Sequence, residues 1–160
     1  MSAEKLITLK INGTNETAGF PPHRTLLEAL RELGHVEVKC GCEKGDCGAC
    51  AVLVDGVAVD SCLTLAWMAE GRNITTISGL ESTHPLLQAF VDVGAAQCGY
   101  CTPGMIMAAK SMLDQNPDPT DEEIRVGLSG NLCRCTGYVK IIEAVTNAAA
   151  AIRAQGGRNE

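Results

Sequence analysis

The sequence has few aromatic residues, no excess of positive charge and no long apolar run. Phe, Tyr and Trp make up only 3% of its 160 residues, so aliphatic, alanine and methionine side chains must build the core. The net charge of −6 at pH 7 argues against a surface for nucleic acid or anionic membranes. No apolar run approaches the ~20 residues that cross a bilayer. We therefore expect no nucleic-acid partner and no membrane span.

The start of the chain also lacks the apolar core of a signal peptide, because its first six residues alternate polar and apolar types. This pattern favours a cytoplasmic protein, unless a partner carries an export signal. In a reducing compartment disulfides are disfavoured, and the odd number of cysteines, nine, cannot pair completely. Metal ligation by most of them, with one cysteine left over, is the better interpretation.

The first half of the chain has the pattern of short strands wrapped around one helix. Asn12-Gly13 and Asp55-Gly56 are turn signals typical of two-residue β-hairpins. Thr25 is a helix-capping residue, and Gly34 is a helix stop. The predicted elements are strands over residues 5–12 and 15–20, a helix over 26–33, strands over 51–54 and 57–59, a short helix over 62–71, and a strand over 74–77.

The second half of the chain has a helical pattern throughout. Thr120 and Glu123 form a capping-box pattern, and Asn116-Pro117 is a hard break before it. We predict an α+β protein with two domains, residues 1–78 and residues 79–160, the second a four-helix bundle. The predicted helices span residues 85–93, residues 103–114, a short segment after Thr120, and residues 138–153.

One cysteine group lies on a glycine-rich loop in the first domain. Its spacing, C-x4-C-x2-C with a later fourth cysteine, is that of plant-type [2Fe–2S] ferredoxins. The interleaved glycines let backbone N–H groups point at the sulfurs. A zinc site also takes four thiolates, but the loop and the β pattern favour iron–sulfur. We therefore predict a plant-type ferredoxin-like β-grasp domain with four ligands: Cys42, Cys47, Cys50 and Cys62.

The other cysteine group consists of two pairs in the helical domain, each followed by a helix start. Helix N-termini carry unpaired N–H groups and a partial positive charge, which suit thiolates. Zinc is a serious rival for such pairs alone, but their position behind a ferredoxin-type domain favours a second cluster. Because a surface loop should expose its thiolates more than a bundle core, we expect chelators to remove the ferredoxin-type cluster first. The predicted ligands are Cys98, Cys101, Cys133 and Cys135.

Three segments, residues 41–50, 97–105 and 130–138, make the chain resemble the small iron–sulfur subunit of the molybdenum hydroxylases, the xanthine oxidase family. The resemblance implies two [2Fe–2S] clusters that carry electrons between a molybdopterin site and FAD or another acceptor. It implies that a large subunit holds the pterin, as molybdopterin cytosine dinucleotide, and that a medium subunit holds FAD. It also implies a dimer of heterotrimers in which this chain carries no catalytic residue of its own.

The resemblance also implies roles for individual residues. Gln97 matches the glutamine that hydrogen-bonds the pterin, and Cys135 matches the cluster ligand nearest to it. Cys40 has no place in the eight-ligand pattern, so it is either a free thiol packed as a small hydrophobe or an alternative to Cys42. The spacing selects Cys42, which favours the free thiol.

Two other functions compete with an electron-transfer subunit. One is a free-standing two-cluster ferredoxin, and the other is a zinc-binding interaction module. The three histidines are not predicted to be metal ligands in either alternative, because each is isolated in the sequence and near a turn. We expect them to be solvated: His23, His35 and His84.

Overall fold

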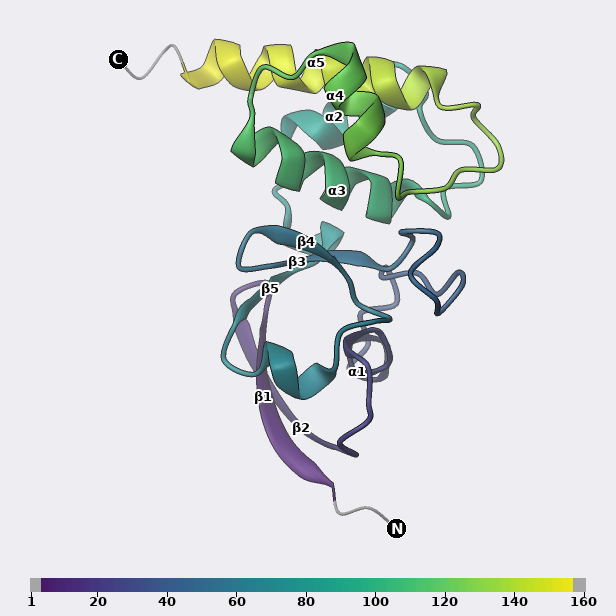
Figure 1. The fold of residues 1–160 in the computed structure, drawn as a ribbon. Coiled ribbons are helices and arrows are strands. Elements are labelled where there is room, and N and C mark those ends of the chain that lie inside the picture. Colours follow the sequence, from purple (N-terminus) through teal and green to yellow (C-terminus); the bar gives the residue numbers. More distant parts are fainter. Residues whose placement is uncertain (1–3, 157–160) are drawn as a thin grey trace.

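The computed structural model describes residues 4–156 and consists of a helical lobe stacked on a β-rich lobe (Figure 1). The β-rich lobe is a five-stranded sheet beside one helix, and the other lobe contains four α-helices. The predicted α+β class and four-helix bundle are confirmed. The first three residues, which bear on the export-signal argument, lie outside the described part of the chain, as do the last four.

Two hairpins build the sheet, and a fifth strand joins them. β1 (Lys5–Ile11) pairs with β2 (Thr14–Phe20), and β3 (Ala51–Val54) pairs with β4 (Val57–Asp60), both antiparallel. Both turns have positive φ at their two central residues, as a type I′ turn requires, so the predicted hairpins are confirmed. β5 (Asn73–Thr75) runs parallel to β1 and antiparallel to β3, which gives the order β2-β1-β5-β3-β4.

The core of the β-rich lobe lies between the sheet and α1 (Leu26–Glu32). Thr25 caps α1, as predicted, and the structure shows that this cap is a reciprocal capping box with Glu28. The leucines on one face of the helix meet alternate residues of β1, so that each element buries its apolar face. The fully buried contributors include Leu26, Leu27 and Leu30 of α1 and Leu9 and Ile11 of β1.

The prediction of a helix over residues 62–71 is wrong. Only Ala66–Ala69 are helical, and they form a short 3₁₀ helix, η1. The preceding backbone instead bonds to the start of α1: Leu26 N–H donates to Thr64 O at 2.7 Å, and Ala66 N–H donates to Arg24 O at 2.9 Å. These tertiary bonds hold Leu65 extended, in a β-bridge with Thr25, and outweigh the local helical pattern.

The helical lobe comprises α2 (Pro85–Asp92), α3 (Thr102–Gln115), α4 (Asp121–Gly127) and α5 (Val139–Gly156). Their apolar faces form a second core, separate from the first. None of the helices within residues 4–156 combines the length and the apolar character needed to span a bilayer. The largest fully buried side chains of this core are Leu86, Met105, Ile106 and Ile124.

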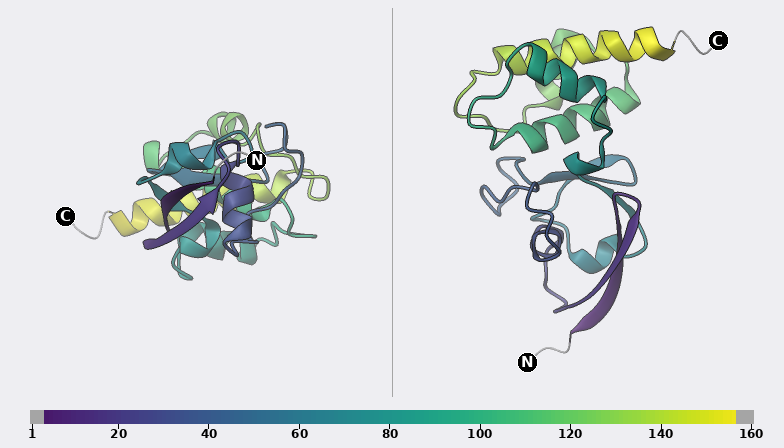
Figure 2. Two further views of the ribbon diagram at one scale, coloured as in Figure 1. Left: turned by 90° about the horizontal axis from the view of Figure 1, so that it is seen from below. Right: turned by 180° about the vertical axis from the view of Figure 1, so that it is seen from behind.

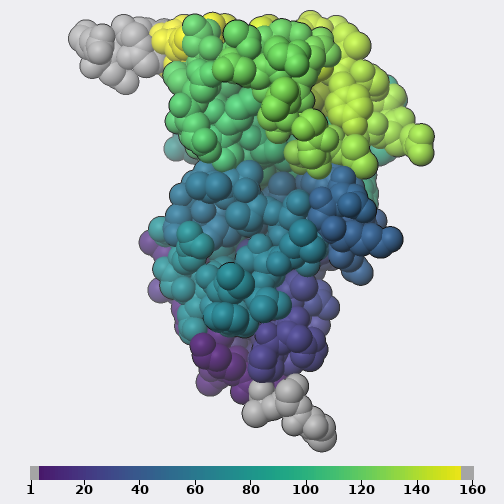
Figure 3. All heavy atoms as spheres, viewed as in Figure 1, coloured from purple at the N-terminus to yellow at the C-terminus, as the bar shows by residue number. Residues whose placement is uncertain are grey.

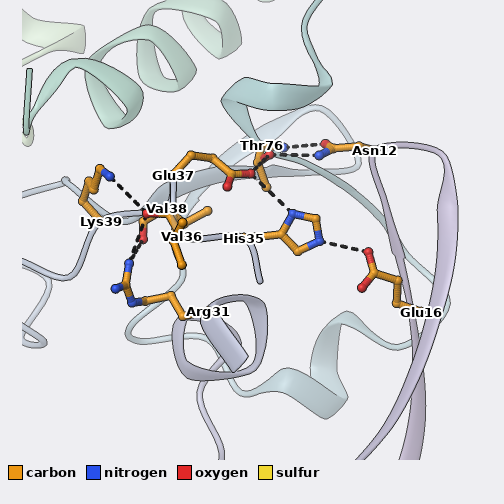
Figure 4. A network of polar contacts seen from close by, with 9 residues as sticks. All are labelled: Asn12, Glu16, Arg31, His35, Val36, Glu37, Val38, Lys39 and Thr76. Atoms are coloured by element: carbon orange, nitrogen blue, oxygen red, sulfur yellow. Dashed lines mark hydrogen bonds and ion pairs between the residues drawn. The ribbon is translucent and has the colours of Figure 1, made fainter. Parts of the chain in front are cut away.

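Two of the histidines expected to be solvated have structural roles. His84 Nδ1 accepts the N–H of Leu86 at 3.2 Å and caps α2, and burial lowers its pKa. His35 Nε2 lies 2.9 Å from a carboxylate oxygen of Glu16 (Figure 4). The expectation is therefore wrong for these two residues and holds for the exposed His23.

α3 covers the outer face of the sheet and joins the two lobes (Figures 1 and 2). In the space-filling view the atoms of the two lobes are in direct contact (Figure 3). Val52 and Val54 of β3 belong to the first core, whereas Leu53, on the opposite face, is buried outside both cores, as is Met107 of α3. The connection between the lobes runs through η2 (Ile77–Gly79). The predicted domain boundary between residues 78 and 79 falls within this turn and stays a prediction.

Candidate metal centres and their junction

The loop between α1 and β3 brings the first predicted ligand set together. The thiols of Cys42 and Cys47 contact each other, and those of Cys50 and Cys62 form a second contacting pair. Fully buried Ser61 donates its hydroxyl to the carbonyl of Cys50 at 2.7 Å, which links the segment of Cys62 to that of Cys50. The four cysteines thus meet although the fourth comes from beyond a β-hairpin.

Backbone N–H groups face sulfur in this loop, as the interleaved glycines predicted. Gly45 and Gly48 have φ of 80° and 64°, values that a glycine adopts without strain. The Lys44 N–H donates to Cys42 Sγ at 3.4 Å and lowers the pKa of that thiol to about 7. Burial instead raises the pKa of Cys62 to about 12. A loop that donates N–H groups to sulfur favours thiolate, the form that binds metal.

The helical lobe brings the second ligand set together at the starts of α3 and α5. Cys98 Sγ and Cys135 Sγ lie 3.6 Å apart, and the thiols of Cys101 and Cys133 contact each other. Cys101 is the N-cap of α3, so the predicted helix start after this pair is confirmed. Burial raises the pKa of Cys133, but hydrogen bonds, first that of the Thr136 hydroxyl, outweigh it and bring the pKa to about 7.

In both sites the thiols make their contacts in twos. Among residues 4–156, no three His, Cys, Asp or Glu side chains converge closely enough to hold one metal ion. A single zinc ion would draw all four thiolates to one point, at ~2.3 Å each. A [2Fe–2S] cluster instead offers two irons, and a pair of cysteines can bind each. The two pairs in each site therefore fit a binuclear cluster better than zinc.

Exposure differs between the two sites in the direction opposite to that expected. Cys98 and Cys135 are exposed, whereas Cys50 and Cys62 are buried, with only 3% and 7% of their surface exposed. Cys50 and Cys62 belong to the core of the β-rich lobe, whereas Cys42 and Cys47, on the outer part of the ferredoxin-like loop, are partly exposed. The expectation that the first site is the more accessible one is wrong.

Gln97 lies on the exposed side of the helical site. It precedes Cys98 and is itself exposed, beside the pair formed by Cys98 and Cys135. The other pair, Cys101 and Cys133, is only partly exposed. The helical site thus has an outer pair, accompanied by Gln97, and an inner pair.

Hydrogen bonds join the loops of the two sites, which project on the same side of the molecule (Figure 1). Leu132 N–H donates to the carbonyl of Cys47 at 2.9 Å, and Asn131 Nδ2 donates to the carbonyl of Gly48 at 3.0 Å. The hydroxyl of Tyr100 donates to the carbonyl of Cys40 at 2.6 Å. The sequence signalled the cysteines but not these contacts, since none of the donors belongs to a ligand pattern.

Cys40 lies near the first site but has a different partner. Its thiol donates to Glu43 Oε1 at 2.9 Å, and this contact raises the pKa of the thiol. The residue also packs against the core of the β-rich lobe. A thiol held protonated by a carboxylate is a poorer metal ligand than Cys42, whose sulfur accepts a backbone N–H.

Known proteins share both halves of this arrangement. Residues 9–76 match the 2Fe-2S iron-sulfur cluster binding domain, and residues 76–146 match the [2Fe-2S] binding domain. The chain is 52% identical over 143 residues to the nicotinate dehydrogenase small FeS subunit of Eubacterium barkeri, covering 87% of this chain and 91% of that one. The chain belongs to the small [2Fe–2S] subunits of the molybdenum hydroxylases.

Further relatives agree with this family in sequence and in fold. The xanthine dehydrogenase iron-sulfur-binding subunit of Escherichia coli is 49% identical over 152 residues, which cover 91% of this chain and 96% of the relative. A chain of quinoline 2-oxidoreductase from Pseudomonas putida 86 superposes with a TM-score of 0.91 at 45% identity, over 98% of this subunit and 99% of that chain. The predicted family is confirmed.

As a member of this family, the subunit binds two [2Fe–2S] clusters and transfers electrons within a multi-subunit molybdenum hydroxylase. The predicted electron-transfer function is therefore confirmed over a zinc module and over a free-standing carrier. Bond chemistry takes place on a partner that holds molybdopterin, as the family implies. The small subunit contributes the two cluster-binding domains.

Proposed function

We propose that the two sets of contacting thiols are the ligands of the two clusters. The ferredoxin-like cluster is held by Cys42, Cys47, Cys50 and Cys62, and the helical cluster by Cys98, Cys101, Cys133 and Cys135. The pairing of the sulfurs supports this assignment, since each pair can hold one iron of a binuclear centre. The clusters supply one-electron transfer when bound, and the chain fixes their ligands and the donors to sulfur.

Electrons enter the subunit at the outer pair of the helical site. The observation that carries this proposal is the exposure of Cys98 and Cys135 beside Gln97. Gln97 is not required to bind iron, yet its amide offers both a donor and an acceptor to a pterin. The pterin is molybdopterin cytosine dinucleotide, held by a large subunit, and Cys135 is the ligand nearest to it.

Electrons leave through the ferredoxin-like cluster to FAD on a medium subunit. Exposed apolar side chains close to Cys62 in sequence support a partner on this side, namely Leu63, Trp67 and Met68, which are 62%, 47% and 54% exposed. The full assembly is a dimer of heterotrimers. It works in the cytoplasm, where the thiols stay reduced until the clusters are inserted.

The entry point is tested by Gln97→Ala in the assembled complex. Both clusters should be retained, while their reduction by the substrate of the complex should slow several-fold or the pterin should be lost on purification. Reduction by dithionite, which bypasses the molybdenum site, should be unchanged. The matched control is Gln155→Ala, which removes an exposed amide near the far end of α5. Unchanged substrate-driven reduction and pterin content in Gln97→Ala would remove the support for this entry point.

A further inference from the structure

Asn131 is a buried amide that reaches from one lobe to the other. Only 7% of the residue is exposed, and its Nδ2 donates to the carbonyl of Gly48 at 3.0 Å. The next residue, Leu132, donates its N–H to the carbonyl of Cys47 at 2.9 Å. Two consecutive donors from the segment before Cys133 therefore meet two consecutive acceptors in the ferredoxin-like loop.

This register places a ligand residue of each site at the two ends of one short connection. From the sulfur of Cys133, covalent bonds lead through its own backbone nitrogen and through Leu132 to the amide N–H of Leu132. A single hydrogen bond then reaches the carbonyl of Cys47, whose side chain carries the other sulfur. Bonds and hydrogen bonds couple redox centres better than an empty gap of the same length.

We propose that Asn131 is a positioning residue for electron transfer between the clusters, because it holds the N–H of Leu132 on the carbonyl of Cys47. This inference rests on the ligand assignment of the proposed function. In the step itself one electron leaves the reduced helical cluster and reduces the oxidised ferredoxin-like cluster. No covalent bond forms or breaks, and no proton moves.

Asn131 anchors the segment on the side of the ferredoxin-like loop, where the side chain of Leu132 does not. On the other side, the Cys133 N–H donates to the Tyr138 hydroxyl at 2.9 Å within the helical lobe. Leu132 is 53% exposed, so its side chain does not fix the position of its backbone. The backbone N–H of Asn131 is itself bound by the carbonyl of Leu128 at 2.9 Å, which ties the segment to the end of α4. Asn131 thus makes one hydrogen bond through its side-chain amide and another through its backbone N–H. Together these two bonds fix the position of the neighbouring Leu132 N–H.

Gly48 permits this close approach. A Cβ at position 48 would lie 2.6 Å from the carbonyl oxygen of Gly130 and would also overlap the amide of Asn131. The φ of 64° at Gly48 is in the left-handed region, where side chains are disfavoured. The glycine and the asparagine therefore form one fitted contact between the two cluster-binding loops.

Among residues 4–156, the other hydrogen bonds between the lobes do not connect ligand residues of the two sites. The Tyr100 hydroxyl ends on Cys40, which is outside the ligand set. The Ser111 hydroxyl accepts the N–H of Ala58 at 3.0 Å and donates to the carbonyl of Gly56 at 3.3 Å, at the hairpin between β3 and β4. Ser111 is 5% exposed, so Ser111→Ala removes a similarly buried contact between the lobes away from the cluster loops.

The experiment compares Asn131→Asp, Asn131→Ala and Ser111→Ala in the full complex. Asn131→Asp keeps the size of the side chain but replaces the amide donor with a carboxylate that cannot donate to Gly48. The readouts are iron content, the potential of each cluster, the magnetic interaction between the two reduced clusters in electron paramagnetic resonance, and the rate of electron transfer between them after photochemical reduction of one cluster.

Both Asn131 variants should retain four irons per chain with little change in potential, as two [2Fe–2S] clusters require. Their magnetic interaction should weaken and the transfer between clusters should slow several-fold, whereas Ser111→Ala should leave both unchanged. Native coupling and rate in the Asn131 variants would overturn the inference. An equal loss in Ser111→Ala would overturn it as well, by showing a general loosening of the lobes.

Two further outcomes separate this inference from the ligand assignment. Loss of a cluster in both Asn131 variants would make the residue a structural one and would also overturn its positioning role. If Cys47→Ala and Cys133→Ala each keep both clusters, the ligand assignment itself is wrong. Native coupling in the Asn131 variants, combined with cluster loss in both cysteine variants, contradicts the positioning role alone.

Discussion

Gly104, in the first turn of α3, lies so close to the carbonyl oxygen of Gly48 that a methyl group at position 104 would overlap it. The same methyl group would lie 3.1 Å from Cα of Ala49. Both neighbours are backbone atoms of the ferredoxin-like loop, which cannot move aside as a flexible side chain can. The start of α3, next to the proposed ligand Cys101, thereby packs directly on the loop proposed to hold the other cluster.

The substitution Gly104→Ala should therefore destabilise the subunit. Alanine favours a helix over glycine by up to ~1 kcal/mol, but overpacking a rigid contact costs ~1–3 kcal/mol. We expect a net loss in the free energy of unfolding, measured by denaturant titration of the cluster-loaded protein. Gly127→Ala is the control, because its methyl would meet the Sδ of Met112 at 2.6 Å, at the flexible part of a side chain. A gain in stability for both variants would show that the contact at Gly104 can relax.

Replacement of Cys40 and of Cys42 should have different effects on the clusters. Cys40 donates its thiol to Glu43, whereas Cys42 accepts a backbone N–H and contacts Cys47. We expect Cys40→Ala to keep the electron paramagnetic resonance signals of both clusters, and Cys42→Ala to lose that of the ferredoxin-like cluster. The reverse result would identify Cys40 as the ligand.

Chelators should remove the helical cluster first from the isolated subunit, the reverse of the order expected from the sequence. Its proposed outer ligands Cys98 and Cys135 are exposed, whereas Cys50 and Cys62 are buried in the other site. The two clusters can be followed by their separate spectra during incubation with a chelator. In the assembled complex this difference should shrink, because the partner covers the outer pair. Earlier loss of the ferredoxin-like cluster from the isolated chain would contradict the accessibility argument.

Glu37 should stabilise the β-rich lobe more at neutral pH than in acid. Its carboxylate accepts the hydroxyl of Thr76 at 2.7 Å and lies 3.4 Å from His35 Nδ1 (Figure 4). Burial raises the pKa of Glu37, but the Thr76 hydroxyl, backbone hydrogen bonding and His35 outweigh it and lower the pKa below its ordinary value of 4.5. The stabilisation is thus fully present above that ordinary value and is lost as the pH falls through the lowered pKa.

Glu37→Gln keeps an oxygen that can accept the Thr76 hydroxyl but removes the negative charge. A hydrogen bond to a charged group contributes about 1 kcal/mol more than a neutral one, so the free energy of unfolding at neutral pH should fall by about that amount. The difference from the unsubstituted protein should shrink when both are measured below pH 4.5. Because both proteins carry the same clusters, the comparison at each pH cancels the acid sensitivity of the clusters. A difference that stays constant with pH would show that the charge of Glu37 contributes nothing.

The sequence by itself determined the elements and the grouping of the cysteines, because their signals are local. Asn12-Gly13 and Asp55-Gly56 adopt the positive φ values that a two-residue hairpin needs. The hydroxyls of Thr25 and Thr120 cap the helices that follow them by accepting the backbone N–H three residues further on. The cysteine spacings likewise assigned each cysteine to one of the two sets without any knowledge of where the loops lie in the fold. The ligand role of each cysteine remains a prediction.

Only the tertiary structure decided which thiols are exposed and how the two sites meet. Exposure depends on which segments cover a loop after folding, so Cys62 is buried and Cys135 is exposed although both were read from spacing alone. The same dependence explains the helix wrongly predicted over residues 62–71, whose backbone bonds to the start of α1 instead. The contact of Asn131 with Gly48 joins residues 83 positions apart, and no short-range pattern encodes a hydrogen bond of that span.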